Sequence, residues 1–486
     1  MAADQIWQWD AAATANAIRA RRISSREATQ AALARLQAVN PAINAVVDLL
    51  ERSALDAADR ADEMLARGDE LGPLHGVPVT TKMNVDLAGR ATTNGLVSMK
   101  DAIATADSAP VANLRHAGAV VIGRTNVPAF CYRWFTDNDL HGLTRNPWGR
   151  DLSPGGSSGG AGAALAAGIG AIAHGNDIAG SVRLPASACG VYGLRPTIGR
   201  VPSYNPASRM EYPMCAQVGA TEGVLARSVR DLELGLRALE RRDHRDPRQA
   251  PAPLPDMRLQ QPCRVALYTG EAQGWTHPEV AAATRKAAQW LADAGYAVEE
   301  FAAPRFAEMA DLWMTMLYAE SSGATRDLLL SLGGDGFRRA TLDTVANLPT
   351  MSAPELQQAW GTRLTILREW SEFLENYPLL LVPTSFQPCF SLNHDLDGED
   401  AVKQILQAYR PLTAIAGLGL PGLSAPAGFA TNGGPIGVQL VAGRFMEQRC
   451  LSAAAVIEQR TGPALPIDPF APPAGTRDGA TRRSTH

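Results

Sequence analysis

The sequence predicts an α/β fold, in which a mixed, mostly twisted β-sheet is sandwiched between helices. Of the 486 residues, 46% are hydrophobic, which is ample for a large core. Short apolar runs alternate with helical segments, a pattern typical of a sheet covered by helices. No linker is long and polar enough to divide the chain. We therefore expect one domain over residues 1–468, with its core at about 72–200, and a disordered tail over 469–486.

The N-terminal part is predicted to be helical. Ser24 and Glu27 have the spacing of a capping box, so a helix is expected to begin there. It is expected to end at Asn40, because Pro41 follows and proline stops helices. A second helix, over residues 53–67, carries many charges and is expected on the surface.

The remaining chain alternates between strands and helices, with a mostly helical insertion around residues 304–377. The strands are predicted at residues 77–82, 120–123, 264–268, 296–298, 379–382, 423–425 and 436–441. The helices outside the insertion are predicted at residues 109–117, 228–242, 278–294, 401–417 and 446–459.

Charge and cysteine usage exclude several classes of function. The net charge is −4, so no basic excess indicates a nucleic-acid or membrane partner. The six cysteines form no CxxC pair and lack histidines at metal-ligand spacing, so we expect reduced thiols, no metal and no cofactor. The N-terminus has no signal-peptide pattern. We expect a cytoplasmic protein acting on small molecules, and the sequence is compatible with a homodimer.

The run from residue 151 to 197 is poor in charge and rich in glycine. Ordered glycine costs conformational entropy, so such a cluster indicates backbone with unusual dihedrals or very close neighbours. Ser157 and Ser158 lie between four glycines, and Ser181 follows an Ala-Gly pair. These serines are either turn residues or candidates for chemistry.

A serine hydroxyl needs a base to become a nucleophile. The two histidines nearest the run, His141 and His174, have no evident triad context. Lys82 ends an apolar strand and has no acidic residue within three positions. A lone lysine is usually a solvated surface charge. Burial, however, disfavours the ammonium and lowers the pKa of a lysine, so Lys82 is a candidate base.

The segment after Asp177 can bind an oxyanion if its turn is tight. Asp177 and Arg183 are expected to form a structural ion pair that holds it. The expected oxyanion donors are the backbone N–H groups of Ile178, Ala179, Gly180 and Ser181.

Two segments rich in aromatic residues and methionine have the composition of either core or an apolar pocket. The candidates for a substrate pocket, which favour a substrate with an aryl or alkyl group, are Phe130, Tyr132, Trp134, Asn176, Trp313 and Met316.

The motifs, taken in order, resemble the amidase signature family, whose hydrolases cleave amides and sometimes esters or carbamates. The likeness extends over roughly residues 5–460. The matching stretches are residues 76–82, 123–126, 144–148, 155–160, 175–183, 185–186, 189–197, 421–424 and 435–440.

The resemblance implies a Ser-cisSer-Lys triad without metal or cofactor. It makes Ser181 the nucleophile, Ser157 the bridging serine and Lys82 the base. In the family the bridge lies 24 positions before the nucleophile, which selects Ser157 over Ser158. The implied reaction is hydrolysis of a linear amide through an acyl-serine intermediate, with a small-molecule amide as substrate. Together with the apolar pocket candidates, this implies an aryl or alkyl amide, anilide or carbamate.

Three residues depart from the family's common pattern and bear on specificity more than on the reaction. Ala179 stands where many members have glycine, which leaves the backbone donor in place if φ stays negative. Asn176 stands where threonine is common, and Met83 replaces an aspartate.

Three alternatives remain open at this point. A glutamine-hydrolysing subunit of a tRNA-dependent amidotransferase shares the motifs. An unrelated α/β-hydrolase would use Ser157 in a nucleophile elbow with a histidine such as His394. A binding protein without catalytic activity is the third.

Overall fold

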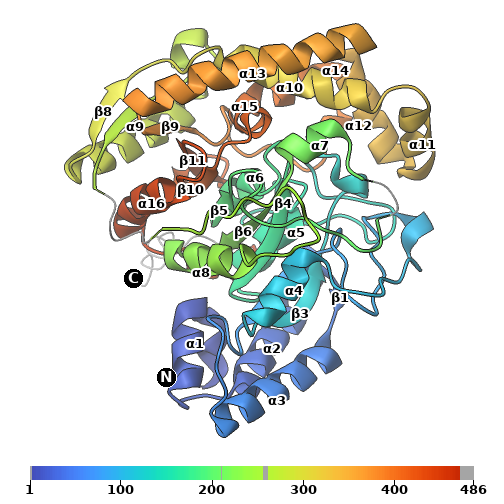
Figure 1. Cartoon of the computed structure of the whole chain (residues 1–486), viewed down its shortest axis with the longest axis vertical. Helices are drawn as coiled ribbons and strands as arrows, with labels where there is room; N and C mark the ends of the chain where they lie inside the picture. Colours follow the sequence, from blue (N-terminus) through green and yellow to red (C-terminus); the bar gives the residue numbers. More distant parts are fainter. Residues whose placement is uncertain (1–2, 209–210, 256–260, 471–486) are drawn as a thin grey trace, which may run out of the picture.

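A computed structural model describes residues 3–208, 211–255 and 261–470 (Figure 1). The predicted tail, residues 469–486, lies almost wholly outside these described residues. Within them the chain has a mixed α/β fold with one large central sheet, as the sequence predicts. Its strands are β1 Val46–Leu49, β2 Pro78–Lys82, β3 Val120–Thr125, β4 Ile172–Asp177, β5 Tyr192–Arg195, β6 Thr221–Ala226, β7 Arg264–Leu267, β8 Ala297–Glu300, β9 Leu379–Pro383, β10 Gly422–Phe429 and β11 Pro435–Ala442.

The strands follow the spatial order β1-β3-β2-β4-β6-β5-β10-β11-β9-β7-β8. β2 is parallel to β3 and β4, and β7 is parallel to β8 and β9. The other neighbouring pairs are antiparallel. The sheet is therefore mixed.

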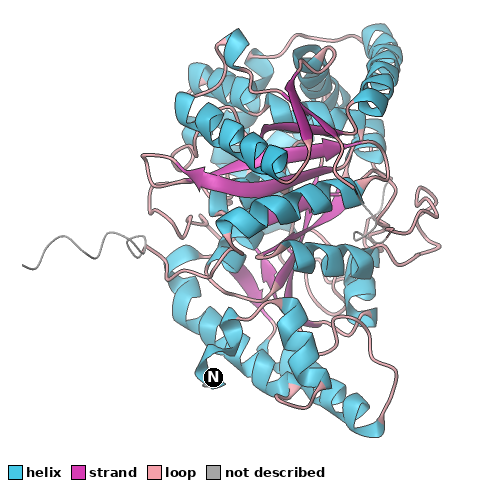
Figure 2. Cartoon of the chain, turned by 90° about the vertical axis from the view of Figure 1, so that its left-hand side faces the viewer, coloured by secondary structure: helices cyan, strands magenta, loops and turns pink. Residues whose placement is uncertain are grey.

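The helices cover the sheet on both sides (Figure 2). In the described residues they are α1 Ala11–Arg19, α2 Ser25–Ile43, α3 Glu51–Arg67, α4 Ala109–His116, α5 Gly159–Ala166, α6 Arg183–Cys189, α7 Met214–Gly219, α8 Val229–Leu239, α9 Pro278–Asp293, α10 Phe306–Glu320, α11 Ala324–Leu332, α12 Gly334–Ala346, α13 Ala353–Asn376, α14 Glu399–Ala408, α15 Arg410–Leu418 and α16 Glu447–Thr461.

Alternate side chains of each strand enter different cores, because successive residues of a strand point to opposite faces. In β9, Leu379 and Leu381 pack in the core that contains α8, α9 and α16. Leu380 and Val382 pack in the core that contains α10, α13 and α15. Near β3 and β4, this second face is covered by α2, α3 and α5. Burial on both faces explains why β9 is apolar along its whole length.

The helical insertion predicted at 304–377 is present as α10 to α13, at the end of the molecule opposite α1 to α3 (Figure 1). The predicted capping box of α2 is confirmed, with both of its hydrogen bonds formed. Among the helices in the described ranges, none has the length and apolar character needed to cross a bilayer.

Two predicted helix boundaries are wrong, and both involve proline. α2 continues through Pro41 to Ile43, because proline in the last turn removes one hydrogen bond while the buried Ile43 still anchors the helix. The single helix predicted at 401–417 is two helices, α14 and α15. Pro411 lies in the first turn of α15, where its missing N–H costs nothing.

Candidate active site

Two parallel strands bring the chemistry-bearing residues together. β2 ends at Lys82, and its neighbour β4 ends at Asp177, shortly before Ser181. The carboxyl ends of parallel neighbours lie at the same edge of a sheet. The glycine run enters this edge from the side, because α5 begins directly after Ser157 and Ser158.

Lys82 is completely buried and makes three polar contacts through its amine. Nζ lies 2.8 Å from Ser157 Oγ, 2.6 Å from Asn176 Oδ1 and 3.5 Å from the Asn176 carbonyl oxygen. Burial lowers the pKa of Lys82, and the charges of nearby acidic groups oppose this shift only in part. The lysine therefore has the environment that favours a neutral amine.

Ser157 follows Gly156 through a cis peptide bond, as the resemblance implies. A Cβ atom on Gly156 would lie 2.6 Å from the carbonyl carbon of Trp134, so only glycine fits between the two segments. The close approach of these segments holds Ser157 against Lys82.

Ser158 has a different environment from its neighbour. Its hydroxyl is buried and has no hydrogen-bond partner among the described residues. Its backbone N–H donates to the carbonyl oxygen of Ser181 at 3.2 Å, which ties the glycine run to the next loop. The lysine thus contacts the first serine of the pair, and the second joins the two loops through its backbone. The Ser181 side chain is also buried.

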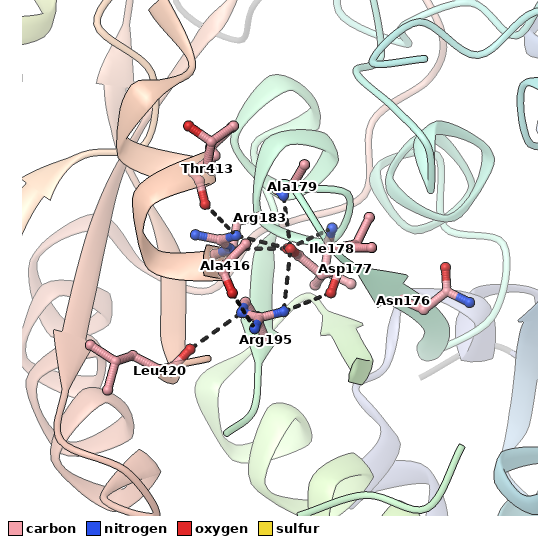
Figure 3. A network of polar contacts seen from close by, with 12 residues as sticks. Asn176, Asp177, Ile178, Ala179, Arg183, Arg195, Thr413, Ala416 and Leu420 are labelled. Atoms are coloured by element: carbon pink, nitrogen blue, oxygen red, sulfur yellow. Dashed lines mark hydrogen bonds and ion pairs between the residues drawn. The ribbon is translucent and has the colours of Figure 1, made fainter. Parts of the chain in front are cut away.

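The loop after β4 is organised around the Asp177 carboxylate (Figure 3). The carboxylate accepts hydrogen bonds from the N–H groups of Gly180 at 2.8 Å and Val182 at 3.1 Å. Arg183 donates to it through Nε at 3.0 Å and Nη2 at 2.9 Å, and both side chains are completely buried. Burial alone would raise the pKa of Asp177, but the charge of Arg183 holds it well below its usual range. The predicted structural ion pair is confirmed.

One of the four expected oxyanion donors is used inside the protein. A buried carboxylate must be paired, and Asp177 takes the N–H of Gly180 as one of its partners. The N–H groups of Ile178, Ala179 and Ser181 have no acceptor among the described residues. Gly180 itself has φ +105°, and a Cβ there would lie 2.6 Å from Leu412 Cβ. The loop therefore offers three backbone donors, and glycine is required at position 180.

Two of the pocket candidates, Trp313 and Met316, are core residues instead. Both are completely buried between α10, α13 and α15. The Trp313 indole N–H donates to the carbonyl oxygen of Ile178 at 2.9 Å, so it supports the loop from behind. Their position in the core, and not in a pocket, follows from helical periodicity. Both residues lie on the face of α10 that is turned toward the core.

A neighbouring face of α10 carries further residues that pack beside the loop. We call this group the Ala179 cluster. Ala179 does not have a positive φ, and Trp134 donates its indole N–H to the Ala179 carbonyl oxygen at 2.9 Å. The cluster consists of the buried Ala179, Met314 and Tyr318 and the partly buried Tyr132, Trp134, Ile178, Leu317, Val345, Leu348 and Leu406.

Phe130 lies outside this cluster and packs against Phe337, with ring centroids 5.3 Å apart. Phe130 and the next residue, Cys131, both have positive φ, at 56° and 58°. The Cys131 thiol donates to Asn94 Oδ1 at 3.4 Å. Burial raises the pKa of this thiol, whereas the charge of the nearby Lys82 acts in the opposite direction. No pattern in the sequence indicated this, because the residue is a single cysteine among aromatic ones.

A second group that the sequence did not predict lies behind Lys82. His174 Nδ1 lies 3.4 Å from the backbone N of Lys82, and His174 Nε2 lies 2.8 Å from Glu222 Oε2. Burial alone would raise the pKa of Glu222, but the hydrogen bond and charge of His174 bring it below its ordinary value. Ser203 donates to the other Glu222 oxygen at 2.6 Å. Glu222 belongs to β6, and only strand pairing places it here.

The histidine of the α/β-hydrolase alternative lies elsewhere. His394 Nδ1 lies 2.8 Å from Asp397 Oδ2, and it forms no hydrogen bond with Ser157. The geometry therefore does not support a serine–histidine pair at this site.

Comparisons with known proteins agree with the motifs. A family model described as Amidase matches residues 27–451. The chain is 44% identical over 458 residues to an indoleacetamide hydrolase of Bradyrhizobium diazoefficiens, covering 94% of this chain and 87% of that one. It is 35% identical over 471 residues to a glutamyl-tRNA(Gln) amidotransferase component from Moorella thermoacetica, covering 90% and 94%. Among solved structures, 6-aminohexanoate cyclic dimer hydrolase complexed with substrate matches with a TM-score of 0.78 and 30% identity, covering 95% and 98%.

Proposed function

The chain belongs to the amidase signature family of hydrolases, and on this basis we propose that Ser181, Ser157 and Lys82 are its catalytic triad. The observation that carries the proposal is the 2.8 Å distance between Lys82 Nζ and Ser157 Oγ at a completely buried lysine. Burial lowers the pKa of Lys82, as a general base requires.

The proposed reaction is acyl transfer to serine followed by hydrolysis. Neutral Lys82 takes a proton from Ser157, and Ser157 takes a proton from Ser181. The Oγ atom of Ser181 then attacks the amide carbonyl. Free backbone N–H groups of the loop bind the oxyanion, each worth about 10²–10³ in rate. The proton returns through Ser157 to the leaving amine, and water then hydrolyses the acyl-enzyme.

Small-molecule amides are the substrate class consistent with the relatives. Within that class we infer that the enzyme acts on primary amides of aryl-substituted acetic acids, such as indoleacetamide. The Ala179 cluster supports this inference, because it supplies aromatic and aliphatic side chains next to the loop. Glutamine has a charged, polar acyl part, which such surroundings do not bind well. The amidotransferase alternative therefore ranks second.

The test is a comparison of kcat/KM for indoleacetamide, phenylacetamide, acetamide, an anilide and glutamine. We expect the arylacetamides to exceed acetamide by at least about tenfold, as filling an apolar pocket provides. Mass spectrometry after treatment with a fluorophosphonate should locate the label on Ser181. Preference for glutamine, or ammonia release only with partner proteins present, would favour the amidotransferase. Failure of the folded protein to label would favour a binding protein.

A further inference from the structure

We propose that Asn176 is a positioning residue that sets the direction of proton transfer at Lys82. This inference rests on the proposed function, in which Lys82 is the base. Asn176 was a candidate for substrate contact, but its side-chain oxygen lies 2.6 Å from Lys82 Nζ, and its carbonyl oxygen lies 3.5 Å away. In Figure 3 its amide points away from the Asp177 network.

The direction of proton transfer follows from the numbers of donors and acceptors around Lys82 Nζ. An ammonium has three N–H donors, and a neutral amine has two together with one lone pair. Two of the three oxygens around Nζ belong to Asn176, and neither of them carries a hydrogen. They can only accept, so they engage the two N–H groups of the neutral amine. The lone pair is then left for the Ser157 hydroxyl, which is the one of these three contacting groups that can donate.

The orientation of the Asn176 amide is set by a chain of asparagines. Asn176 donates through Nδ2 to Asn84 Oδ1 at 3.2 Å, so its oxygen is the atom that faces Lys82. Asn84 is held in turn, because its carbonyl oxygen accepts from Asn205 Nδ2 at 3.0 Å. Asn205 Oδ1 accepts from the backbone N–H of Asp86 at 2.8 Å. The Asn176 amide thus has its oxygen on Lys82 and its nitrogen on Asn84, and Asn205 holds the backbone of the segment that carries Asn84.

The charges around Lys82 explain why a neutral acceptor suits this position. Cys131, Glu222 of β6 and Asp177 of β4 raise the pKa of Lys82 against the effect of burial. His174 of β4 contacts the backbone of Lys82. An asparagine oxygen holds the amine without a further negative charge. An aspartate there would stabilise the ammonium and keep the base protonated.

Two variants and one control test the proposal through the pH dependence of kcat/KM. In Asn176→Asp the acceptor remains but the charge favours the ammonium. We expect the ascending limb to move to higher pH by about one unit or more, with activity recovering at high pH. Asn176→Leu removes the side-chain acceptor. We expect kcat to fall about 10²-fold at every pH, with KM within about threefold.

Asn84→Asp is the matched control. It introduces the same charge one hydrogen bond further from Lys82 and keeps an acceptor for Asn176 Nδ2. Its pH profile should move less than that of Asn176→Asp. Equal shifts would indicate a general field effect and overturn the positioning role. A raised KM with unchanged kcat in Asn176→Leu would make Asn176 a substrate contact and would also overturn it.

Two further measurements separate this inference from the proposed function. If Lys82→Ala keeps turnover, the triad itself is wrong. If Lys82→Ala abolishes turnover and Ser181 is labelled, but both Asn176 variants behave as wild type, only the role of Asn176 fails. Thermal unfolding shows whether the Asn176→Leu variant is folded. If it is not folded, the pH profile of Asn176→Asp, whose side chain has the same size, decides the role of Asn176. The pH dependence of fluorophosphonate labelling at Ser181 gives a second readout without substrate.

Discussion

Lys82 Nζ lies 2.8 Å from Ser157 Oγ, although the two residues are 75 positions apart in the chain. Lys82 is the last residue of the central strand β2, and Ser157 lies in the glycine-rich loop before α5. The contact connects a completely buried strand of the sheet to a segment whose small residues permit close approach. It gives the buried lysine a hydroxyl partner, which makes the pair suitable for proton transfer.

Replacing Lys82 should abolish turnover without unfolding the protein. Lys82→Met preserves the apolar part of the side chain and removes the proposed base. We expect kcat/KM to fall by about 10²–10⁴ or more. The midpoint of thermal unfolding should stay the same or rise, because the variant no longer buries an amine. Full activity of the folded variant in steady-state assays would instead support a serine nucleophile with a different base.

The value of kcat/KM should rise with pH, and this rise should occur at pH values below the ordinary pKa of lysine. Burial lowers the pKa of Lys82, and only its neutral form accepts a proton. Activity is therefore absent below the lowered pKa and reaches a plateau above it. A profile of kcat/KM against pH measures this limb. An ascending limb that remains in wild type near the pKa of an exposed lysine would contradict a neutral buried base.

Breaking the ion pair beneath the loop should destabilise the protein strongly. Arg183→Leu leaves Asp177 buried without its main partner, and we expect a loss of about 3–5 kcal/mol in the free energy of unfolding. Urea denaturation measures this. The partly exposed pair of His394 and Asp397 provides a control, since Asp397→Asn should change stability by about 0.5 kcal/mol or less.

The same ion pair predicts the response of stability to acid. The pKa of Asp177 is lowered in the folded protein, so the pair contributes fully above the unfolded pKa of the carboxyl. That contribution is lost as the pH falls through the folded value. Wild type should therefore lose more stability on acidification than Asp177→Asn, as measured by urea denaturation at several pH values. Equal losses would mean that other carboxylates dominate.

Two methionines on opposite faces of α10 should separate specificity from stability. Met314 belongs to the Ala179 cluster, so Met314→Ala should lower kcat/KM for arylacetamides by about tenfold and change that for acetamide little. Met316 lies in the core, so Met316→Ala should cost about 2–5 kcal/mol of stability and leave the preference between the amides unchanged. The reverse pattern would place the acyl group on the other side of the helix.

Local patterns predicted much of this molecule. The alternating strands and helices, the capping box at Ser24 and the glycine-rich run all depend on residues close in sequence, and each is present. The buried pair Asp177–Arg183 was also predictable from its spacing. The helix boundaries near Pro41 and Pro411 were not. Packing of the buried Ile43 carries α2 past Pro41, whereas Pro411 begins a new helix at a position that suits proline.

The sequence by itself determined the fold class, seven of the eleven strands in the described residues, and the small residues that allow two loops to meet at the edge of the sheet. It did not predict β1, β4, β5 and β6. Only the tertiary structure decided which face of α10 borders the loop, which N–H group Asp177 uses, and that Glu222 and Asn84 support the lysine's surroundings. The physical reason is that these choices involve groups far apart in the chain. Their energies depend on burial and on the direction of each donor, which exist only after the sheet has formed.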